Sequence, residues 1–244
     1  MRRWLLAAAL SSGVGAAAYW RKALTVDGAL AAAVVGAVVF ARGGPRAALA
    51  LIAFFVSSSA LSRVGQDRKR SAELAQSKGA QRDAWQVLAN GGVATVAIAA
   101  KREPAFVGAL AAAAADTWAT ELGMLARGEP RLITTLEPVA PGTSGGVTLQ
   151  GLAASAAGAL VVGIAAGRVR RAVIAGLAGS LADSLLGATV QSAYACQVCG
   201  ATVEEPIHRA CGAAATKRKG LTWANNDSVN AAATAAGALI ATLL

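Results

Sequence analysis

The chain alternates between long apolar segments and short polar connectors. Eight apolar segments stand out, at residues 4–20, 23–41, 45–62, 84–100, 104–126, 146–167, 172–195 and 228–244. About 20 apolar residues in an α-helix are enough to cross the hydrocarbon core of a bilayer. Glycine or a charged residue interrupts several segments, so the pattern predicts six to eight transmembrane helices. We therefore expect an all-α fold, a polytopic membrane bundle that forms one domain over residues 1–244.

Composition supports this prediction and indicates how the helices pack. The sequence is 55% hydrophobic and 15% charged, whereas soluble domains carry roughly 25% charged residues. Small residues dominate the apolar segments, with Gly163 and Gly167 four positions apart and Gly176 and Gly179 three apart. Small faces let helix backbones approach closely in lipid, where the hydrophobic effect does not drive association. The sequence thus predicts an integral membrane protein whose helices pack through small residues.

The net charge of +10 comes from basic residues in the connectors. That placement is typical of contact with membrane lipids, and it argues against nucleic acid as a partner. The connectors after the first, third, fifth and seventh segments hold 14 Lys and Arg, against 9 on the other side. The positive-inside rule puts the richer side in the cytoplasm, so we expect a bacterial-type inner-membrane protein with both termini outside. The N-terminal stretch also resembles a cleavable signal peptide, and that alternative stays open.

The stretch AADTWATELG places two carboxylates, Asp116 and Glu121, at the end of an apolar run. Ionisable groups inside a span are costly and usually face a cavity or a partner. At 100° per residue the two carboxylates lie about 140° apart, so Asp116 shares a helix face with Thr120 and Gly123, and Glu121 shares one with Thr117. Carboxylates and hydroxyls suit a hydrated divalent cation. The alternative is a helix end in the head-group layer, where carboxylates cost little.

A second acidic face lies in the stretch GSLADSLLGA. Ser180, Asp183, Ser184 and Gly187 follow one another at offsets of three and four, so they line one stripe of a helix. A lone Asp there could pair with an arginine for structural reasons. Two carboxylate faces in one small membrane protein favour a functional role.

The stretch PGTSGGVT combines glycines and hydroxyls directly before an apolar segment. Gly142, Gly145 and Gly146 allow backbone conformations that other residues avoid, and Thr143 and Ser144 add donors. Backbone N–H groups at a helix N-terminus attract phosphate. The Lys-Ser/Thr ending of a Walker A loop is missing. The alternative interpretation is a simple turn.

The stretch TWANNDSVN places three polar side chains, Asn225, Asn226 and Asp227, where the last apolar segment starts. One of them is enough to cap a helix, so the other two suggest ligand binding. A basic run that ends at Lys219 lies just upstream and could offset phosphate charge. Marking the cytoplasmic side is the simpler role for that run.

The three cysteines and the single histidine of the chain are close in sequence. Cys196, Cys199, His208 and Cys211 give the spacing C-x₂-C-x₈-H-x₂-C, which suits tetrahedral zinc with no open coordination position. We expect a structural zinc knuckle over residues 196–211, inserted in a cytoplasmic connector. The alternatives are a reduced thiol cluster, or one disulfide if the connector lies outside.

Taken as an ordered set, these stretches resemble one membrane family. The matching stretches are LTVDGALAA, ADTWATELG, PGTSGGVTLQG, GSLADSLLGA, the CxxC…HxxC insert and TWANNDSVN, which together cover residues 24–230. The family contains the plant phytyl-phosphate kinase of vitamin E synthesis and is distantly similar to the dolichol kinases. The resemblance implies transfer of a phosphoryl group from a nucleoside triphosphate, CTP above all, to an isoprenyl monophosphate of the phytyl or geranylgeranyl type, with Mg²⁺ as cofactor.

Phosphoryl transfer depends mostly on positioning and charge neutralisation, and the polar stretches supply candidates for both tasks. The candidate catalytic residues are Asp116, Glu121, Asp183 and Asp227, the first three as Mg²⁺ ligands. The candidate phosphate-binding residues are Gly142, Thr143, Ser144, Gly145, Gly146, Ser180, Ser184, Lys219, Asn225 and Asn226. The main alternative is an ion- or proton-coupled transporter that uses the intramembrane carboxylates. A third interpretation is a lipid-binding scaffold without catalysis.

Overall fold

The structure, a computed structural model, describes residues 2–65, 81–208 and 210–244. Most of the basic connector between Arg63 and Arg82 therefore lies outside the described residues. The helices form in the segments that the apolar pattern marks. They are α1 (Arg2–Trp20), α2 (Val26–Leu61), α4 (Ala84–Ala99), α5 (Glu103–Gly123), α6 (Leu149–Ala166), α7 (Val169–Thr189) and α8 (Asn226–Leu243).

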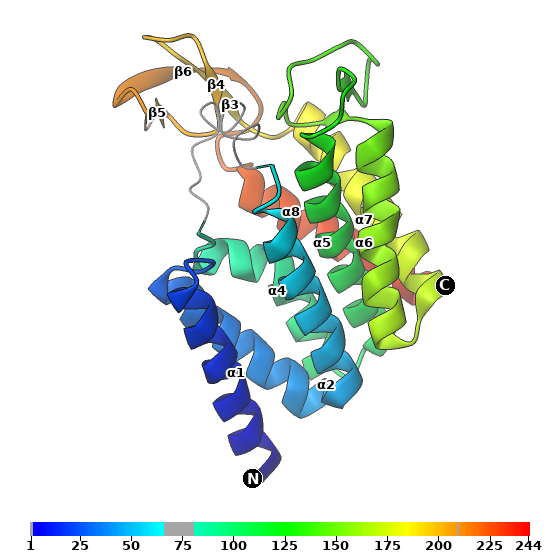
Figure 1. The fold of residues 1–244 in the computed structure, drawn as a ribbon. Helices are drawn as coiled ribbons and strands as arrows, with labels where there is room; N and C mark the ends of the chain where they lie inside the picture. Colours follow the sequence, from blue (N-terminus) through cyan, green and yellow to red (C-terminus); the bar gives the residue numbers. More distant parts are fainter. Residues whose placement is uncertain (1, 66–80, 209) are drawn as a thin grey trace.

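Helix α2 is a hairpin of two limbs. Its 36 residues would measure about 54 Å if straight, yet both of its ends reach Arg82. The Thr25 N–H donates to the Arg82 carbonyl at 3.1 Å, and Arg82 Nη2 donates to Ser62 Oγ at 3.4 Å. The chain reverses at Gly44, whose φ of 75° is unstrained only for glycine, and proline follows it. The two limbs, blue and cyan in Figure 1, confirm the two segments that the sequence separates here.

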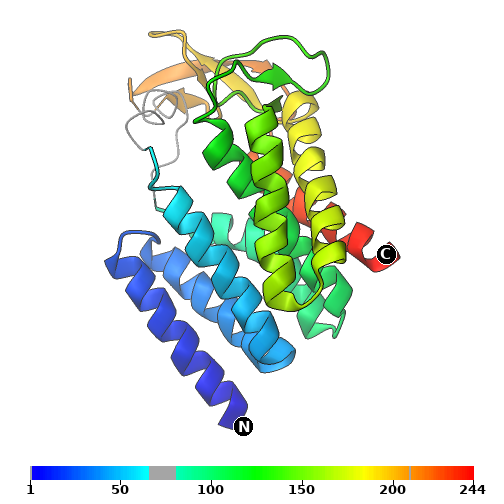
Figure 2. The same cartoon turned by 45° about the vertical axis from the view of Figure 1, so that its right-hand side comes forward.

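The helices alternate in direction, so alternate connectors meet at the same end of the bundle. At one end Leu24, before α2, pairs with Arg82, before α4. At the other end Arg168, before α7, forms an ion pair with Glu103, at the start of α5, at 3.4 Å. Figure 2 shows the strands gathered above the first end, away from both termini. The first and third connectors thus lie at one end and the fourth and sixth at the other. The predicted orientation assumes this grouping of alternate connectors.

Helix α5 forms the centre of the bundle and packs on α6, α7 and α8. Its residues 109–115 are alanines and leucine with almost no exposed surface. Neighbouring glycines allow this approach: a β-carbon at Gly158 of α6 would lie 2.7 Å from the Ala114 carbonyl oxygen, and one at Gly179 of α7 would overlap the Ala112 side chain. The expected packing through small residues is confirmed.

The expectation of an all-α fold is wrong in the connectors, where the described residues include six short strands. Strands β1 (Arg131–Leu132) and β2 (Gly146–Val147) pair with each other, and β3 (Ala193–Cys196), β4 (Thr202–Val203), β5 (Ile207–His208) and β6 (Ala213–Lys219) form an antiparallel sheet of order β4-β3-β6-β5. Most of these strands have two to four residues, too few for a period-two pattern to stand out. The predicted segments 146–167 and 172–195 accordingly extend beyond their helices into strands.

Three of the described helices, α2, α6 and α7, are long and apolar enough to cross a membrane. Helix α4 is apolar but has only 16 residues. The fold is therefore a membrane helical bundle with a small sheet at one end. The expected total of six to eight spans stays a prediction.

Candidate functional site

A polar cavity of about 140 Å³ lies at the end of the bundle that carries the strands. The ends of α5 and α7, the start of α8 and the connector between α5 and α6 all contribute to it. The structure thus brings together ten of the predicted site residues, from four separate stretches: Asp116, Gly142, Thr143, Ser144, Gly145, Gly146, Ser180, Asp183, Ser184 and Asn226.

Helix α5 presents the predicted face to this cavity. Asp116, Thr120 and Gly123, at offsets of four and seven, all line it. The Gly123 backbone packs close to Gly151 at the start of α6. A β-carbon at Gly151 would lie 3.2 Å from the Ala119 carbonyl oxygen of α5, so the glycine there lets the α6 N-terminus pack close to the Asp116 face.

Helix α7 contributes Ser180, Asp183 and Ser184. Within the described parts of the chain, the buried Oδ2 of Asp183 has no hydrogen-bond partner. Asp183 also lies close enough to Asp116 and Glu204 to be repelled by both carboxylates. A buried, unpaired carboxylate oxygen among other carboxylates is unfavourable unless a cation or donor joins it. The arrangement therefore fits a bound divalent cation.

Glu204 is a cavity residue that the sequence analysis missed. It lies in the turn between β4 and β5, and its Oε1 accepts a hydrogen bond from Gln191 Nε2 at 3.0 Å. Both residues line the cavity. The acidic residues 204 and 205 of the cysteine-rich insert are visible in the sequence. The sheet that places them over the helix ends was not predicted, so Glu204 was missed.

The glycine-rich connector forms a tight turn against the end of α7. Gly142 and Gly145 have φ values of 82° and 86°, and the Gly146 N–H donates to the Thr143 carbonyl at 2.9 Å. A β-carbon at Gly145 would lie 2.6 Å from atoms of Ala188. Glycine is thus required at Gly145 by both conformation and space.

The turn leads directly into β2 and the N-terminus of α6. Thr148 caps that helix by accepting from the Gly151 N–H at 2.9 Å, and both residues line the cavity. Asn226, the first residue of α8, lines it as well. Two helix N-termini therefore border a cavity that also holds three carboxylates. Helix N-termini favour anions, so a cation and a phosphate can both be accommodated.

Glu121, predicted as a ligand beside Asp116, is not among the residues that line this cavity. Its carboxylate accepts a hydrogen bond from the Ser62 hydroxyl at the end of α2. It also faces Arg82, whose pKa is lowered by burial while the Glu121 charge acts in the opposite direction. Helix geometry is the reason, since an offset of five residues turns Glu121 away from the Asp116 face.

Three other candidates also lie outside the cavity lining. Lys219 Nζ donates to the carbonyls of Gly187 and Ala188, at 3.0 and 3.2 Å, and so closes the C-terminus of α7; burial lowers the pKa of this lysine. Asn225 is the N-cap of α8, which is the simpler role foreseen for it. Asp227 is in the first turn of α8, beyond the residues that line the cavity.

The predicted metal ligands converge on one point. The ligand atoms of Cys196, Cys199, His208 and Cys211 all lie within 4.8 Å of one another, and Cys199 Sγ lies 3.4 Å from His208 Nδ1. All three cysteines are free thiols, so the disulfide alternative is not the arrangement found. Backbone N–H groups of Cys199 and Val198 lower the pKa of the Cys196 thiol to about 6. Three thiolates and one imidazole fit a tetrahedral metal such as zinc.

The four ligands flank the segment that carries Glu204. Cys196 ends β3 and Cys199 follows it, while His208 ends β5 and Cys211 follows that strand. A metal held by all four would join both ends of this segment. The ligand cluster and the acidic cavity are therefore connected through a short stretch of backbone.

These features define a polytopic membrane protein with an acidic cavity and a Cys₃His cluster at one end of its helices. The chain belongs to the integral membrane protein family DUF92, whose sequence profile matches residues 9–238. It is 36% identical over 176 residues to Protein PGR of Arabidopsis thaliana, covering 64% of this chain and 61% of that protein.

Two uncharacterized membrane proteins are also similar. One, from Synechocystis, is 34% identical over 166 residues, covering 63% of this chain and 64% of the relative. The other, from Methanocaldococcus jannaschii, is 32% identical over 139 residues, covering 54% and 57%. The chain thus spans about three fifths of the length of these relatives. No solved structure matches it.

Proposed function

We propose that this protein is a membrane-embedded lipid-phosphate kinase. It transfers a phosphoryl group from a nucleoside triphosphate, CTP on the family resemblance, to an isoprenyl monophosphate and yields the diphosphate. The observation that carries the proposal is the meeting of Asp116 and Asp183 with the glycine-rich turn around one cavity. Carboxylates for a metal and backbone donors for phosphate are the two elements that this chemistry requires.

The residues divide into two groups in this proposal. Asp116, Asp183 and Glu204 would hold Mg²⁺, which supplies charge neutralisation on the donor phosphates when bound. The turn at 142–146 and the α6 N-terminus bind the donor phosphates through backbone N–H groups. An oxygen of the acceptor phosphate attacks the terminal phosphorus, and the bond from that phosphorus to the nucleoside diphosphate breaks. The acceptor is already an anion, so no general base is needed.

The position of the cavity favours this reaction over ion-coupled transport. Transporters generally place their ion-binding carboxylates near the bilayer midplane. Here the three carboxylates line one cavity at the end of the bundle that carries the strands. The charge count predicts that this end faces the cytoplasm, where nucleoside triphosphates are available.

The proposal is tested with purified protein, Mg²⁺, labelled CTP and phytyl or geranylgeranyl phosphate. We expect labelled isoprenyl diphosphate from the wild type and none from Asp183→Asn. The matched control is Asp83→Asn, because Asp83 caps α4 through its side chain and asparagine caps equally well. If the wild type forms no diphosphate with any nucleotide or prenyl chain length, the kinase assignment is wrong. Full activity of Asp183→Asn would instead show that the acidic cavity is not the site of the reaction.

A further inference from the structure

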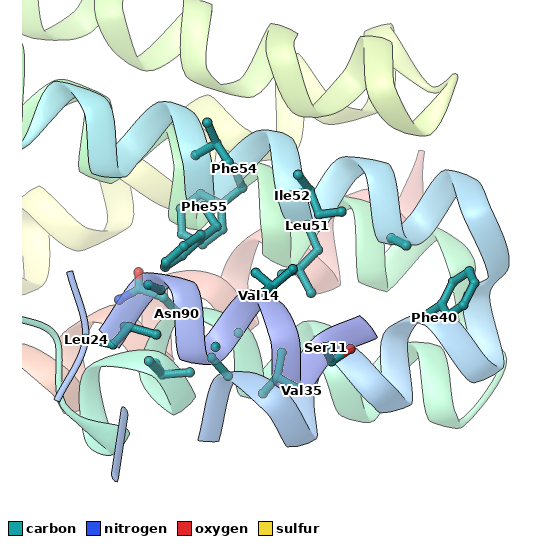
Figure 3. A pocket seen from close by; sticks show the side chains of 18 of the residues that line it. Ser11, Val14, Leu24, Val35, Phe40, Leu51, Ile52, Phe54, Phe55 and Asn90 are labelled. Carbon is teal, nitrogen blue, oxygen red and sulfur yellow. The ribbon is translucent and has the colours of Figure 1, made fainter. Parts of the chain in front are cut away.

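A second and larger cavity lies on the other side of α5, between α1, the two limbs of α2 and α4. Its volume is about 390 Å³, within the range of small-molecule binding pockets. Figure 3 shows Val14 of α1 opposite Leu51 of α2, with Phe40 toward one end of the space and Asn90 toward the other. Most of the residues that line it are aliphatic or aromatic.

The cavity is elongated along the helices. On the second limb of α2 its lining runs from Pro45 to Val56, which at 1.5 Å per residue is about 16 Å. On the facing helix α1 it runs from Leu10 to Ala18. A narrow apolar space of this shape suits one extended hydrocarbon chain.

One end of the cavity is polar. Arg82, Gln86, Asn90 and Thr117 line it there, and Leu24, which pairs with Arg82, marks this as the end of the bundle that carries the strands. The Arg82 guanidinium is partly buried, so a negatively charged group placed beside it would be attracted with little screening by water. Glu121, facing the same guanidinium, supports its charged form.

The side of the cavity is bordered by exposed apolar residues. Leu10 and Val14 of α1 and Leu49 and Ile52 of α2 line it, yet each leaves 46% to 55% of its surface exposed. In an integral membrane protein such residues meet lipid chains. A hydrocarbon chain can therefore enter from the bilayer without crossing a polar barrier.

We infer that this cavity binds a lipid with one hydrocarbon chain and an anionic head, the chain lying along α2 and the head beside Arg82. The volume of about 390 Å³ suits one chain rather than the two chains of a phospholipid. The inference concerns binding alone and does not require phosphoryl transfer, so its test omits nucleotide.

The test uses the full chain in nanodiscs of zwitterionic lipid, with radiolabelled hexadecyl phosphate as the probe. We expect saturable binding at one site, competed poorly by hexadecanol and by two-chain phosphatidic acid. Arg82→Gln should weaken hexadecyl phosphate at least tenfold and leave hexadecanol within twofold. Arg63→Gln is the matched control, because Arg63 is exposed at the same end and does not line the cavity.

A second pair of variants tests the chain site and does not depend on Arg82. Ala48→Phe fills the cavity and should abolish binding, whereas Ala60→Phe, exposed on the same limb and outside the lining, should not. Thermal melts establish that each variant folds. Non-saturable binding as boundary lipid only, equal binding of phosphate and alcohol, or unchanged binding in Ala48→Phe would each overturn the inference. Kinase activity without such binding would leave the proposed reaction standing and remove this site.

Discussion

Asp116 and Glu121 are five residues apart on α5 but face two different polar sites. Asp116 lines the acidic cavity with α7 and the glycine-rich turn, while Glu121 accepts a hydrogen bond from Ser62 and faces Arg82. Helix α5 thus separates a site suited to metal and phosphate from one suited to a lipid. Both lie at the end of the bundle that carries the strands, so the last turns of α5 lie between the two.

This separation predicts different effects for two similar substitutions. Asp116→Asn should abolish divalent-cation binding because it removes a carboxylate from the cavity. Glu121→Gln should leave that binding intact but lower the unfolding free energy by about 1–3 kcal/mol, since it weakens a partly buried contact with Ser62 and Arg82. Calorimetric titration with Mg²⁺ and denaturant unfolding measure the two quantities. Equal loss of cation binding in both variants would place Glu121 back in the acidic site.

Divalent cation should stabilise the wild type through the carboxylates around Asp183. Three carboxylates that repel one another are relieved when a cation binds, so folding and binding are linked. At a concentration 100 times the dissociation constant the gain is about 2.7 kcal/mol. The shift in thermal midpoint with added Mg²⁺ or Mn²⁺ measures it. We expect no shift in Asp183→Asn and a normal shift in Asp83→Asn; a normal shift in both would show that the cation binds elsewhere.

Helix positions and the main acidic face could be read from the sequence, because they depend on local patterns. Apolar segments gave the helices, and offsets of three and four placed Asp116 with Thr120, and Ser180 with Asp183. The angle of about 140° between Asp116 and Glu121 around the helix also indicated that Glu121 lies on a different face from Asp116. The chain reversal at Gly44 was visible as a short break between two apolar segments.

What the sequence could not give depends on contacts between distant segments. The strands of the insert are too short for a clear pattern, so Glu204 could not be placed over α7. Lys219 looked like a phosphate ligand because of its neighbours in sequence, but β6 carries it to the carbonyls at the end of α7. The Cys₃His cluster was predictable because its ligands are close in sequence and are the only cysteines and histidine in the chain.

Gly145 should be essential for binding the donor phosphates. Alanine is unfavourable at this position for two reasons: φ is 86°, and the β-carbon would lie 2.6 Å from Ala188. An unfavourable φ alone costs on the order of 1–3 kcal/mol. The turn would move away from the end of α7 and its N–H groups with it. We expect Gly145→Ala to weaken nucleotide binding at least tenfold by equilibrium dialysis. Gly128→Ala is the control, because a β-carbon there meets open space, and an equal effect in both would contradict the assigned role of the turn.

The metal cluster should position Glu204 for the acidic cavity. Cys196→Ser removes one of four ligands, so we expect the bound zinc, measured by elemental analysis, to fall from about one equivalent to near zero. The segment between Cys199 and His208 then loses the metal that joins its two ends, and Glu204 loses its place beside Gln191. Mg²⁺ affinity should fall in Cys196→Ser by as much as in Glu204→Gln, and combining the two changes should add little further loss. Glu205→Gln, which alters the neighbouring carboxylate, should keep both metals. Full loss of zinc with unchanged Mg²⁺ affinity would show that the cluster stabilises the sheet alone and does not act on the cavity.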